Sequence, residues 1–167
     1  MEILFLFLLK IKLLQDVYGK LNLILKKKLI VKPHPSPVLT KLAENLINEI
    51  DPSIIIIKNV ELHKLINDCE VLITFNNSTT TLDAISMNKP VISLQTDSYA
   101  NEDDIAQAGA ILSISEIKDL ENGIKKILYD NDFKKKLMEK SDLFLQKYMK
   151  NQGHASESVV EVLSKNI

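Results

Sequence analysis

Short runs of consecutive apolar residues alternate along the chain with longer stretches in which apolar residues recur every three or four positions. The short runs are rich in β-branched residues and lack polar alternation, which is typical of parallel strands buried on both faces. The longer stretches have the period of amphipathic helices. The expected strands are 3–9, 29–31, 54–57, 71–75, 91–94 and 110–114. The expected helices are 11–25, 37–50, 61–68, 80–88, 101–109, 116–129, 131–149 and 155–165.

This alternation of strands and helices predicts an α/β fold, specifically a Rossmann-like, doubly wound parallel sheet with flanking helices. The length of 167 residues suits a single domain, with C-terminal helices over about 116–165. Three prolines in five residues, from Pro33 to Pro37, end the second strand. Pro37 also suits the first turn of the helix that follows.

The composition is that of a globular chain, with 46% apolar and 26% charged residues. The 21 basic and 22 acidic side chains nearly cancel, so we expect no nucleic-acid partner. A single cysteine, Cys69, excludes a disulfide framework and suits a reducing compartment, so we expect a cytoplasmic protein.

The apolar run 3–9 lacks the basic start and the cleavage site of a signal peptide, and it is too short to span a membrane. We interpret it as a buried strand. The alternative is that it docks on a partner or on the inner face of a membrane.

Glycines are too few and too scattered for the dinucleotide fingerprint G-x-G-x-x-G or for a P-loop. The chain also has no H-E-x-x-H, no G-x-S-x-G and no paired His/Cys spacing. We therefore expect no metal and no cofactor, and no residue is assigned as catalytic. His63 and Cys69 are interpreted as structural. The four glycines are Gly19, Gly109, Gly123 and Gly153.

Polar residues gather after three of the expected strands, and open parallel sheets bind ligands beyond the carboxyl ends of their strands. The segment 76–81 joins one strand directly to a helix. The first N–H groups of a helix attract phosphate, and the hydroxyls and amide of this segment add donors. This pattern predicts a phosphate site without glycines. The donors are Asn77, Ser78, Thr79 and Thr80.

The alternative is that this segment only caps the helix, because Thr80 and Asp83 have capping-box spacing. His34 lies between two prolines that pin its backbone, and an imidazole there can donate to a phosphate or serve as acid or base. Lys32 adds a positive charge two residues earlier. Asn101 and Glu102 open a helix, where an acidic residue suits the helix dipole. Bonding to sugar hydroxyls is the alternative role for this pair.

Two motifs resemble those of GT-B enzymes that make surface polysaccharides, such as the capsule and teichoic-acid type transferases. The first is Lys32-Pro33-His34-Pro35, which resembles a KPHP element at a strand end. The second runs from Glu70 to Ile92 and resembles the pattern D-hydrophobic-ITxxSTxxxEA…GKPVI, with Asp83 in place of Glu and Asn88 in place of Gly. The resemblance covers about residues 20–165. UDP-N-acetylglucosamine 2-epimerases are related through the same fold.

The resemblance implies the C-terminal, nucleotide-binding half of a GT-B enzyme, a fold that requires no metal. The ligand would be a nucleotide-linked donor, such as a UDP-, CDP- or CMP-linked one. The residues implied at the phosphates are His34, Ser78, Thr79 and Thr80, with Asn77 and Lys32 beside them. Those implied at the base are Asn59 and Val60, and those implied at the donor sugar are Asn101 and Glu102.

A GT-B enzyme has a second, N-terminal domain with the acceptor site and usually the catalytic base, and we expect this chain to lack it. Metal-independent glycosyltransferase activity is therefore expected only with a second domain, a partner chain or a homo-oligomer. Two alternatives stay open. The chain is half of a sugar-nucleotide 2-epimerase, or it is a non-catalytic module for nucleotide-sugar binding or assembly.

Overall fold

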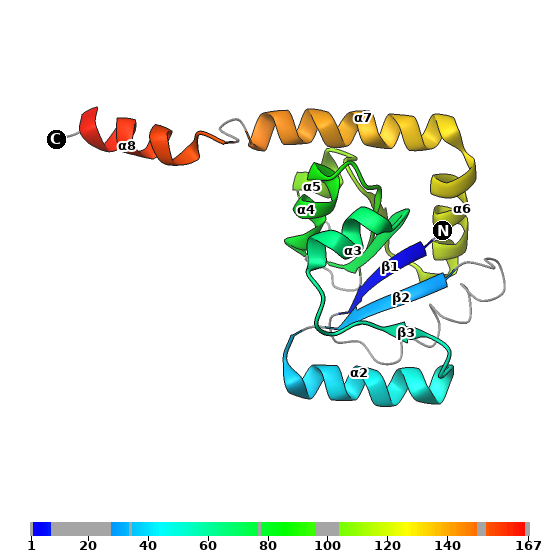
Figure 1. The fold of residues 1–167 in the computed structure, drawn as a ribbon. Helices are drawn as coiled ribbons and strands as arrows, with labels where there is room; N and C mark the ends of the chain where they lie inside the picture. The colour runs from blue at the N-terminus through cyan, green and yellow to red at the C-terminus, as the bar shows by residue number, and fades with distance from the viewer. Residues whose placement is uncertain are drawn as a thin grey trace.

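The computed structural model describes residues 2–7, 28–33, 35–76, 78–95, 104–149 and 153–165. Within these residues, parallel strands form one six-stranded sheet in the order β3-β2-β1-β4-β5-β6, of which Figure 1 labels β1, β2 and β3. The strands are β1 (Glu2–Phe7), β2 (Lys28–Pro33), β3 (Ile55–Ile56), β4 (Val71–Phe75), β5 (Val91–Leu94) and β6 (Leu112–Ile114). The helices are α2 (Pro37–Ile50), α3 (Leu62–Asp68), α4 (Thr80–Ser86), α5 (Asp104–Gln107), the 3-10 helix η2 (Ile117–Asp119), α6 (Leu120–Tyr129), α7 (Asn131–Tyr148) and α8 (Ala155–Lys165).

The strand order reverses between β1 and β4. The chain passes outward from β1 to β2 and β3, then returns to place β4 on the other side of β1. Ile3 of β1 pairs with Val71 of β4, and Phe5 pairs with Ile73. This reversal is the switch point at which doubly wound sheets bind ligands, beyond the carboxyl ends of the strands. The predicted Rossmann-like fold is therefore confirmed.

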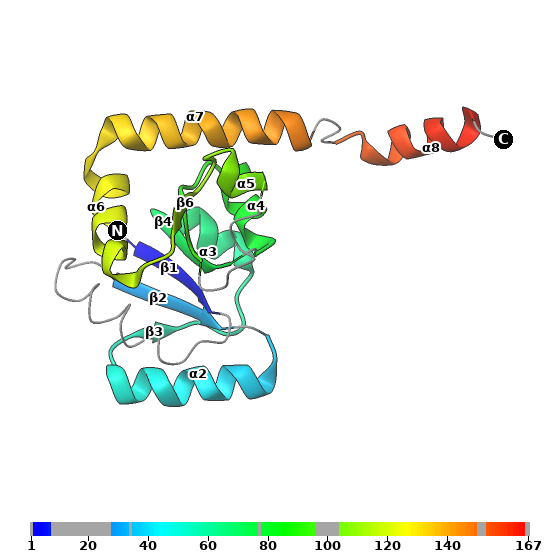
Figure 2. The ribbon, with the colours of Figure 1, turned by 180° about the vertical axis from the view of Figure 1, so that it is seen from behind.

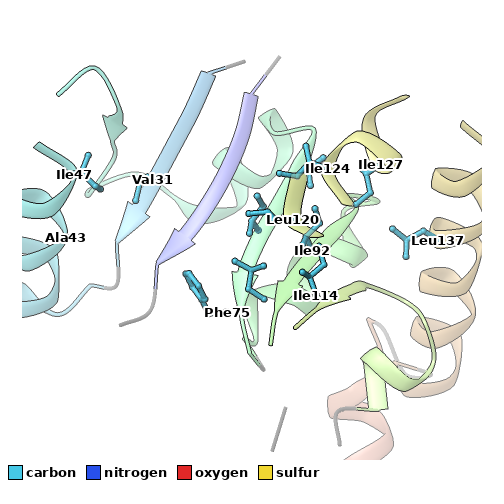
Figure 3. Packing of buried hydrophobic residues seen from close by; sticks show 13 residues of the cluster. Val31, Ala43, Ile47, Phe75, Ile92, Ile114, Leu120, Ile124, Ile127 and Leu137 are labelled. Atoms are coloured by element: carbon cyan, nitrogen blue, oxygen red, sulfur yellow. The ribbon is translucent and has the colours of Figure 1, made fainter. Parts of the chain in front are cut away.

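Two hydrophobic clusters cover the two faces of the sheet. The first joins β2, β4, β5 and β6 to α2 and α6, and Figure 3 shows its side chains. The second lies on the opposite face and includes side chains of α3, α4 and α5. The long helix α7 contributes Leu137 to the first cluster and Phe144 to the second, so it ties both layers together.

The buried strands and the proline-initiated helix match the sequence prediction to the residue. β4 and β5 have the predicted bounds, and every residue in both is buried. α2 likewise has the predicted bounds and begins with Pro37 in its first turn. A central strand is covered on both faces, so its apolar run has no polar alternation.

Two expected strands are too long. Of 54–57, only Ile55–Ile56 pairs, and both residues are half-buried. The reason is that β3 lies at the edge of the sheet, where one side has no neighbouring strand. The expected strand 110–114 begins only at Leu112. Ala110 and Ile111 are buried in the core without belonging to the strand.

Other boundaries also differ. β1 (Glu2–Phe7) begins one residue before the expected strand 3–9, and residues 8–9 and the expected helix 11–25 lie outside the described residues. The expected helix 101–109 is described only from residue 104, and α5 ends at Gln107.

The expected helix 80–88 ends at Ser86, because Asn88 adopts a left-handed backbone with φ of +57°. Its N–H donates to the Ile85 carbonyl at 3.0 Å, and the Lys89 N–H donates to the Ala84 carbonyl at 2.9 Å. These two bonds form a Schellman motif, which usually places glycine in the left-handed position. Asparagine tolerates that conformation better than most residues, so the motif accommodates Asn88 where the resembling family has glycine.

The last helix, α8, extends away from the rest of the molecule, as Figures 1 and 2 show from opposite sides. None of its residues is buried. Its apolar side chains are 57–64% exposed, and they are Val159, Val160, Val162 and Leu163. Among the described helices, none is long and apolar enough to cross a membrane.

Candidate functional site

A pocket of about 460 Å³ opens where β2 and β3 end, next to α2. It brings together Lys32, predicted at the phosphates, and Asn59, predicted at the base. Val60 is not among its lining residues, and its side chain is exposed. The lining residues are Lys32, Pro33, Pro35, Pro37, Thr40, Lys41, Glu44, Asn45, Lys58 and Asn59.

Charged and polar groups line this pocket and give it mixed character. Lys32 is half-buried, and its Nζ donates to the Pro33 carbonyl at 3.4 Å. Lys58 forms an ion pair with Glu44 of α2, which links the loop after β3 to that helix. His34 belongs to the same loop as the prolines but lies outside the described residues. The pocket therefore offers a ligand the positive side chain of Lys32 and the amide of Asn59, at the end of the sheet where β2 and β3 lie.

The second part of the site is a tight turn at the end of β4. Asn76 has a left-handed backbone with φ of +46°. Its N–H donates to the Leu94 carbonyl at 2.9 Å. Its carbonyl accepts from the Ser93 hydroxyl at 2.9 Å and from the Ser78 N–H at 3.1 Å. These three hydrogen bonds fix how the chain leaves β4 and enters the Ser/Thr run.

The start of α4 is not capped as the spacing predicted. Thr79 is the residue before the helix, and its side chain makes no capping hydrogen bond. Thr80 is already helical and buried, so the predicted capping box with Asp83 is wrong. The Asp83 carboxylate instead lies 3.7 Å from Nε2 of His63. The Thr79 hydroxyl therefore has no capping role in the structure.

The predicted phosphate-binding residues differ in their access to solvent. Ser78 is half-buried, Thr79 is exposed and Thr80 is 6% exposed. A ligand at this edge of the sheet therefore meets Ser78 and Thr79 more readily than Thr80. The remaining predicted residues, Asn77, Asn101 and Glu102, lie outside the described residues.

Two residues interpreted as structural have been placed. Cys69 is buried, and its thiol donates to the Ile66 carbonyl at 3.2 Å. His63, expected in the middle of its helix, is the second residue of α3, and its side chain is 58% exposed. In the part of the chain that the structure describes, no group of three His, Cys, Asp or Glu side chains is placed to hold a metal.

Sequence reasoning missed Gln95, which directly follows β5. Its side chain is only 6% exposed, although the residue begins a polar stretch of sequence. Its Nε2 donates to the Ser93 hydroxyl at 3.0 Å. The signal that was available is its position, since it continues a strand that is buried on both faces.

Comparison with known proteins identifies both a family and a fold. A model described as the LIC12162 family transferase matches residues 10–108, which is more than half of the chain. A sequence search of curated proteins finds no match.

Several solved structures share the fold at low sequence identity. Anabaena Alr3699/HepE, in complex with UDP-glucose, aligns with a TM-score of 0.67 at 12% identity, over 98% of this chain and 48% of that one. UDP-GlcNAc 2-epimerase from Neisseria meningitidis, bound to UDP-GlcNAc, aligns at 0.61 and 16% identity, over 90% and 44%. The C-terminal domain of the group 1 glycosyl transferase LpcC from Francisella tularensis aligns at 0.65 and 14% identity, over 89% and 86%.

These alignments establish the Rossmann-like half of the GT-B fold. This chain spans about half the length of the Anabaena and Neisseria proteins, whereas it spans most of the isolated C-terminal domain from Francisella.

Proposed function

The chain belongs to the LIC12162 family of transferases, and we propose that it binds the nucleotide-linked donor of a GT-B glycosyltransferase that builds a surface polysaccharide or another glycan. The observation that carries this proposal is the turn at Asn76. Hydrogen bonds with β5 and with the Ser78 N–H hold it in a left-handed conformation, and the chain passes from it into Ser78 and Thr79 beyond the carboxyl end of β4.

In this proposal the donor's diphosphate lies against the start of α4. Ser78 and Thr79 donate hydrogen bonds to it, with Thr80, Asn77 and His34 completing the set expected from the sequence. Hydrogen bonds to a charged phosphate are stronger than those between neutral groups. Because Thr79 has no capping role, its hydroxyl need not leave a helix end unpaired in order to reach the ligand.

The base and the sugar would lie on either side of the diphosphate. We place the base beside Asn59, in the pocket that Lys32 also lines, with the backbone of Val60 next to it. We place the donor sugar near Asn101 and Glu102, after β5. The neighbours crystallised with UDP-glucose and UDP-GlcNAc support a nucleotide-sugar ligand of this kind.

The chemical contribution of this half would be electrostatic. When the glycosyl bond breaks, negative charge grows on the departing nucleoside diphosphate. Donors that are already oriented toward that charge lower the barrier, because they need no reorganisation at the moment of reaction. We propose that the acceptor site and the catalytic base come from a second domain or a partner chain.

A second candidate function is half of a sugar-nucleotide 2-epimerase, which the alignment with the Neisseria enzyme favours. Both candidates require the same phosphate site, and they differ in the reaction that follows. Mixing the chain with its second half and analysing the products separates them: a transferase releases the nucleoside diphosphate, whereas an epimerase returns an isomerised donor.

Isothermal titration of the full chain with UDP, CDP, CMP and their sugar-linked forms tests the proposed site. Ser78→Ala and His34→Ala should each weaken binding by roughly 10- to 100-fold, the range for a hydrogen bond to a charged group. Ser158→Ala on α8 is the matched control, because it removes a hydroxyl from an exposed helix far along the chain. Unchanged affinity in both site variants would disprove the assigned phosphate contacts.

A further inference from the structure

Buried polar side chains gather at one place in this fold, the junction of β4 with α4. Ser93 lies in β5, and Gln95 lies two residues later, directly after that strand. Both side chains are on the same face, since alternate residues of an extended chain share a face. Thr74 of β4 approaches Thr81 of α4, with their hydroxyl oxygens 3.5 Å apart. In the described part of the chain, the buried polar residues are Thr74, Thr80, Thr81, Ser93, Gln95 and, elsewhere, Ser141.

The hydrogen bonds at this junction have only one consistent direction. The Asn76 carbonyl can only accept, so the Ser93 hydroxyl must donate its single proton to it. The two oxygen atoms are 2.9 Å apart. The Ser93 oxygen can then only accept from its other neighbour. Gln95 must therefore turn its NH₂ group toward Ser93, at 3.0 Å. A carboxylate or an amide turned the other way would meet the oxygen without a proton between them.

This orientation has a cost. It directs Oε1 of Gln95 into a buried position where none of the described residues provides a donor. A buried oxygen without a donor destabilises the folded state. An apolar side chain of similar size at this position would avoid the cost. The chain nevertheless has an amide at this position. The NH₂ group of that amide supports, through Ser93, the turn that leads into the Ser/Thr run.

We propose that Gln95 is a positioning residue for the phosphate site: through Ser93 it holds the left-handed turn at Asn76 and thereby fixes Ser78 and Thr79 against the donor. This role rests on the proposed function, because it requires that Ser78 and Thr79 meet the ligand. Gln95 itself need not touch the donor. It acts two hydrogen bonds away, through the carbonyl that also accepts from the Ser78 N–H at 3.1 Å.

The test combines UDP affinity, thermal unfolding and amide hydrogen exchange in the full chain. Gln95→Met removes the donating NH₂ and also the unpaired oxygen at nearly constant volume. Ser93→Ala removes the link. Each should weaken UDP binding about fivefold to tenfold, the effect of losing one positioning hydrogen bond. The double variant should lose no more than either single one, because both changes break the same relay.

Two readouts separate positioning from general stability. The Ser78 amide should exchange faster in Gln95→Met and in Ser93→Ala, because its acceptor is no longer held. The melting temperature of Gln95→Met should stay level or rise. Ser141→Ala is the matched control, because it removes another buried serine hydroxyl, one that donates to the Ala110 carbonyl at 2.6 Å. It should lower the melting temperature and leave UDP affinity unchanged.

The outcomes also distinguish the positioning role of Gln95 from the proposed nucleotide binding on which it rests. Unchanged exchange at Ser78 in both variants overturns the positioning role, whatever happens to UDP. Faster exchange with unchanged UDP affinity overturns it as well, because the turn would then not serve the ligand. If the wild-type chain binds no nucleotide, the proposed function fails, and the exchange measurement still decides whether Gln95 holds the turn.

Discussion

Two asparagines stand at opposite ends of α4, and both adopt left-handed backbones that few residues tolerate. Asn76, with φ of +46°, leads from β4 into the helix, and Asn88, with φ of +57°, leads out of it toward β5. The turn at Asn88 is closed by two backbone hydrogen bonds within the chain segment itself. The turn at Asn76 is held by the backbone and a side chain of β5, and behind that side chain stands a buried glutamine.

From this difference we infer that the turn at Asn88 is structural and that the turn at Asn76 serves the proposed ligand site. A Schellman motif satisfies the end of a helix by local means and occurs in many helices. The turn at Asn76 depends on residues almost twenty positions away, and its support leaves the Gln95 oxygen without a donor from the described residues. Strained backbone that is fixed by its surroundings is typical of ligand sites. We therefore expect the turn at Asn76 to contribute to ligand binding and the turn at Asn88 to contribute to stability alone.

The largest expected effect comes from placing valine in either turn. A β-branched residue in the left-handed region is strongly disfavoured, so Asn76→Val and Asn88→Val should each lower the free energy of unfolding by about 2 kcal/mol. Urea denaturation measures this loss. The two variants should differ in UDP affinity, measured where both are folded, because only Asn76→Val should weaken it. If Asn76→Val and Asn88→Val bind UDP with equal affinity, the two turns do not differ in their role in binding.

The second-largest loss of stability is expected from replacing Lys89, which follows the left-handed residue Asn88. Its Nζ donates to the Asn67 carbonyl at 2.5 Å and to the Cys69 carbonyl at 3.1 Å, at the end of α3. A cation there also suits the helix dipole. Lys89→Met should lower the free energy of unfolding by about 1.5 kcal/mol and leave UDP affinity unchanged. Lys64 is an exposed lysine of α3, and Lys64→Met is the control. It should change neither the free energy of unfolding nor UDP affinity by much.

The smallest effect is expected for Asn88→Gly. Glycine relieves the strain of the left-handed backbone, but it also increases the entropy of the unfolded chain. These contributions oppose one another, so the free energy of unfolding should change by no more than about 0.5 kcal/mol. Asn88→Ala has only the unfavourable backbone and should cost about 1 kcal/mol. A large loss in the glycine variant would show that the Asn88 side chain is required here.

The sequence alone was sufficient for the central strands and for the helix that begins at Pro37. β4 and β5 are buried on both faces, so each is mostly apolar with a single hydroxyl residue, and polar residues mark where each strand ends. The edge strand β3 was predicted too long, because four consecutive isoleucines do not reveal which of them has a neighbouring strand.

The sequence predicted a site beyond the carboxyl ends of the strands, and that site stays a prediction. It was inferred from the polar residues that follow β2, β4 and β5. The spacing of Thr80 and Asp83 suggested a capping box, but Thr80 lies inside the helix and Asp83 approaches His63 of the neighbouring helix α3. The position of Gln95 directly after the buried strand β5 was a local signal for its burial, but its hydrogen bond with Ser93 depends on the three-dimensional structure.

The central claim is that a donor's diphosphate binds at the turn after β4. Amide chemical shifts of the isotopically labelled chain, followed during titration with UDP, test it most directly. We expect the largest shifts at Ser78 and Thr79, with smaller ones near Asn59 and almost none at Asn88 and Lys89. Shifts centred on the Asn88 turn, or saturation by UDP without any change at Ser78 and Thr79, would contradict it.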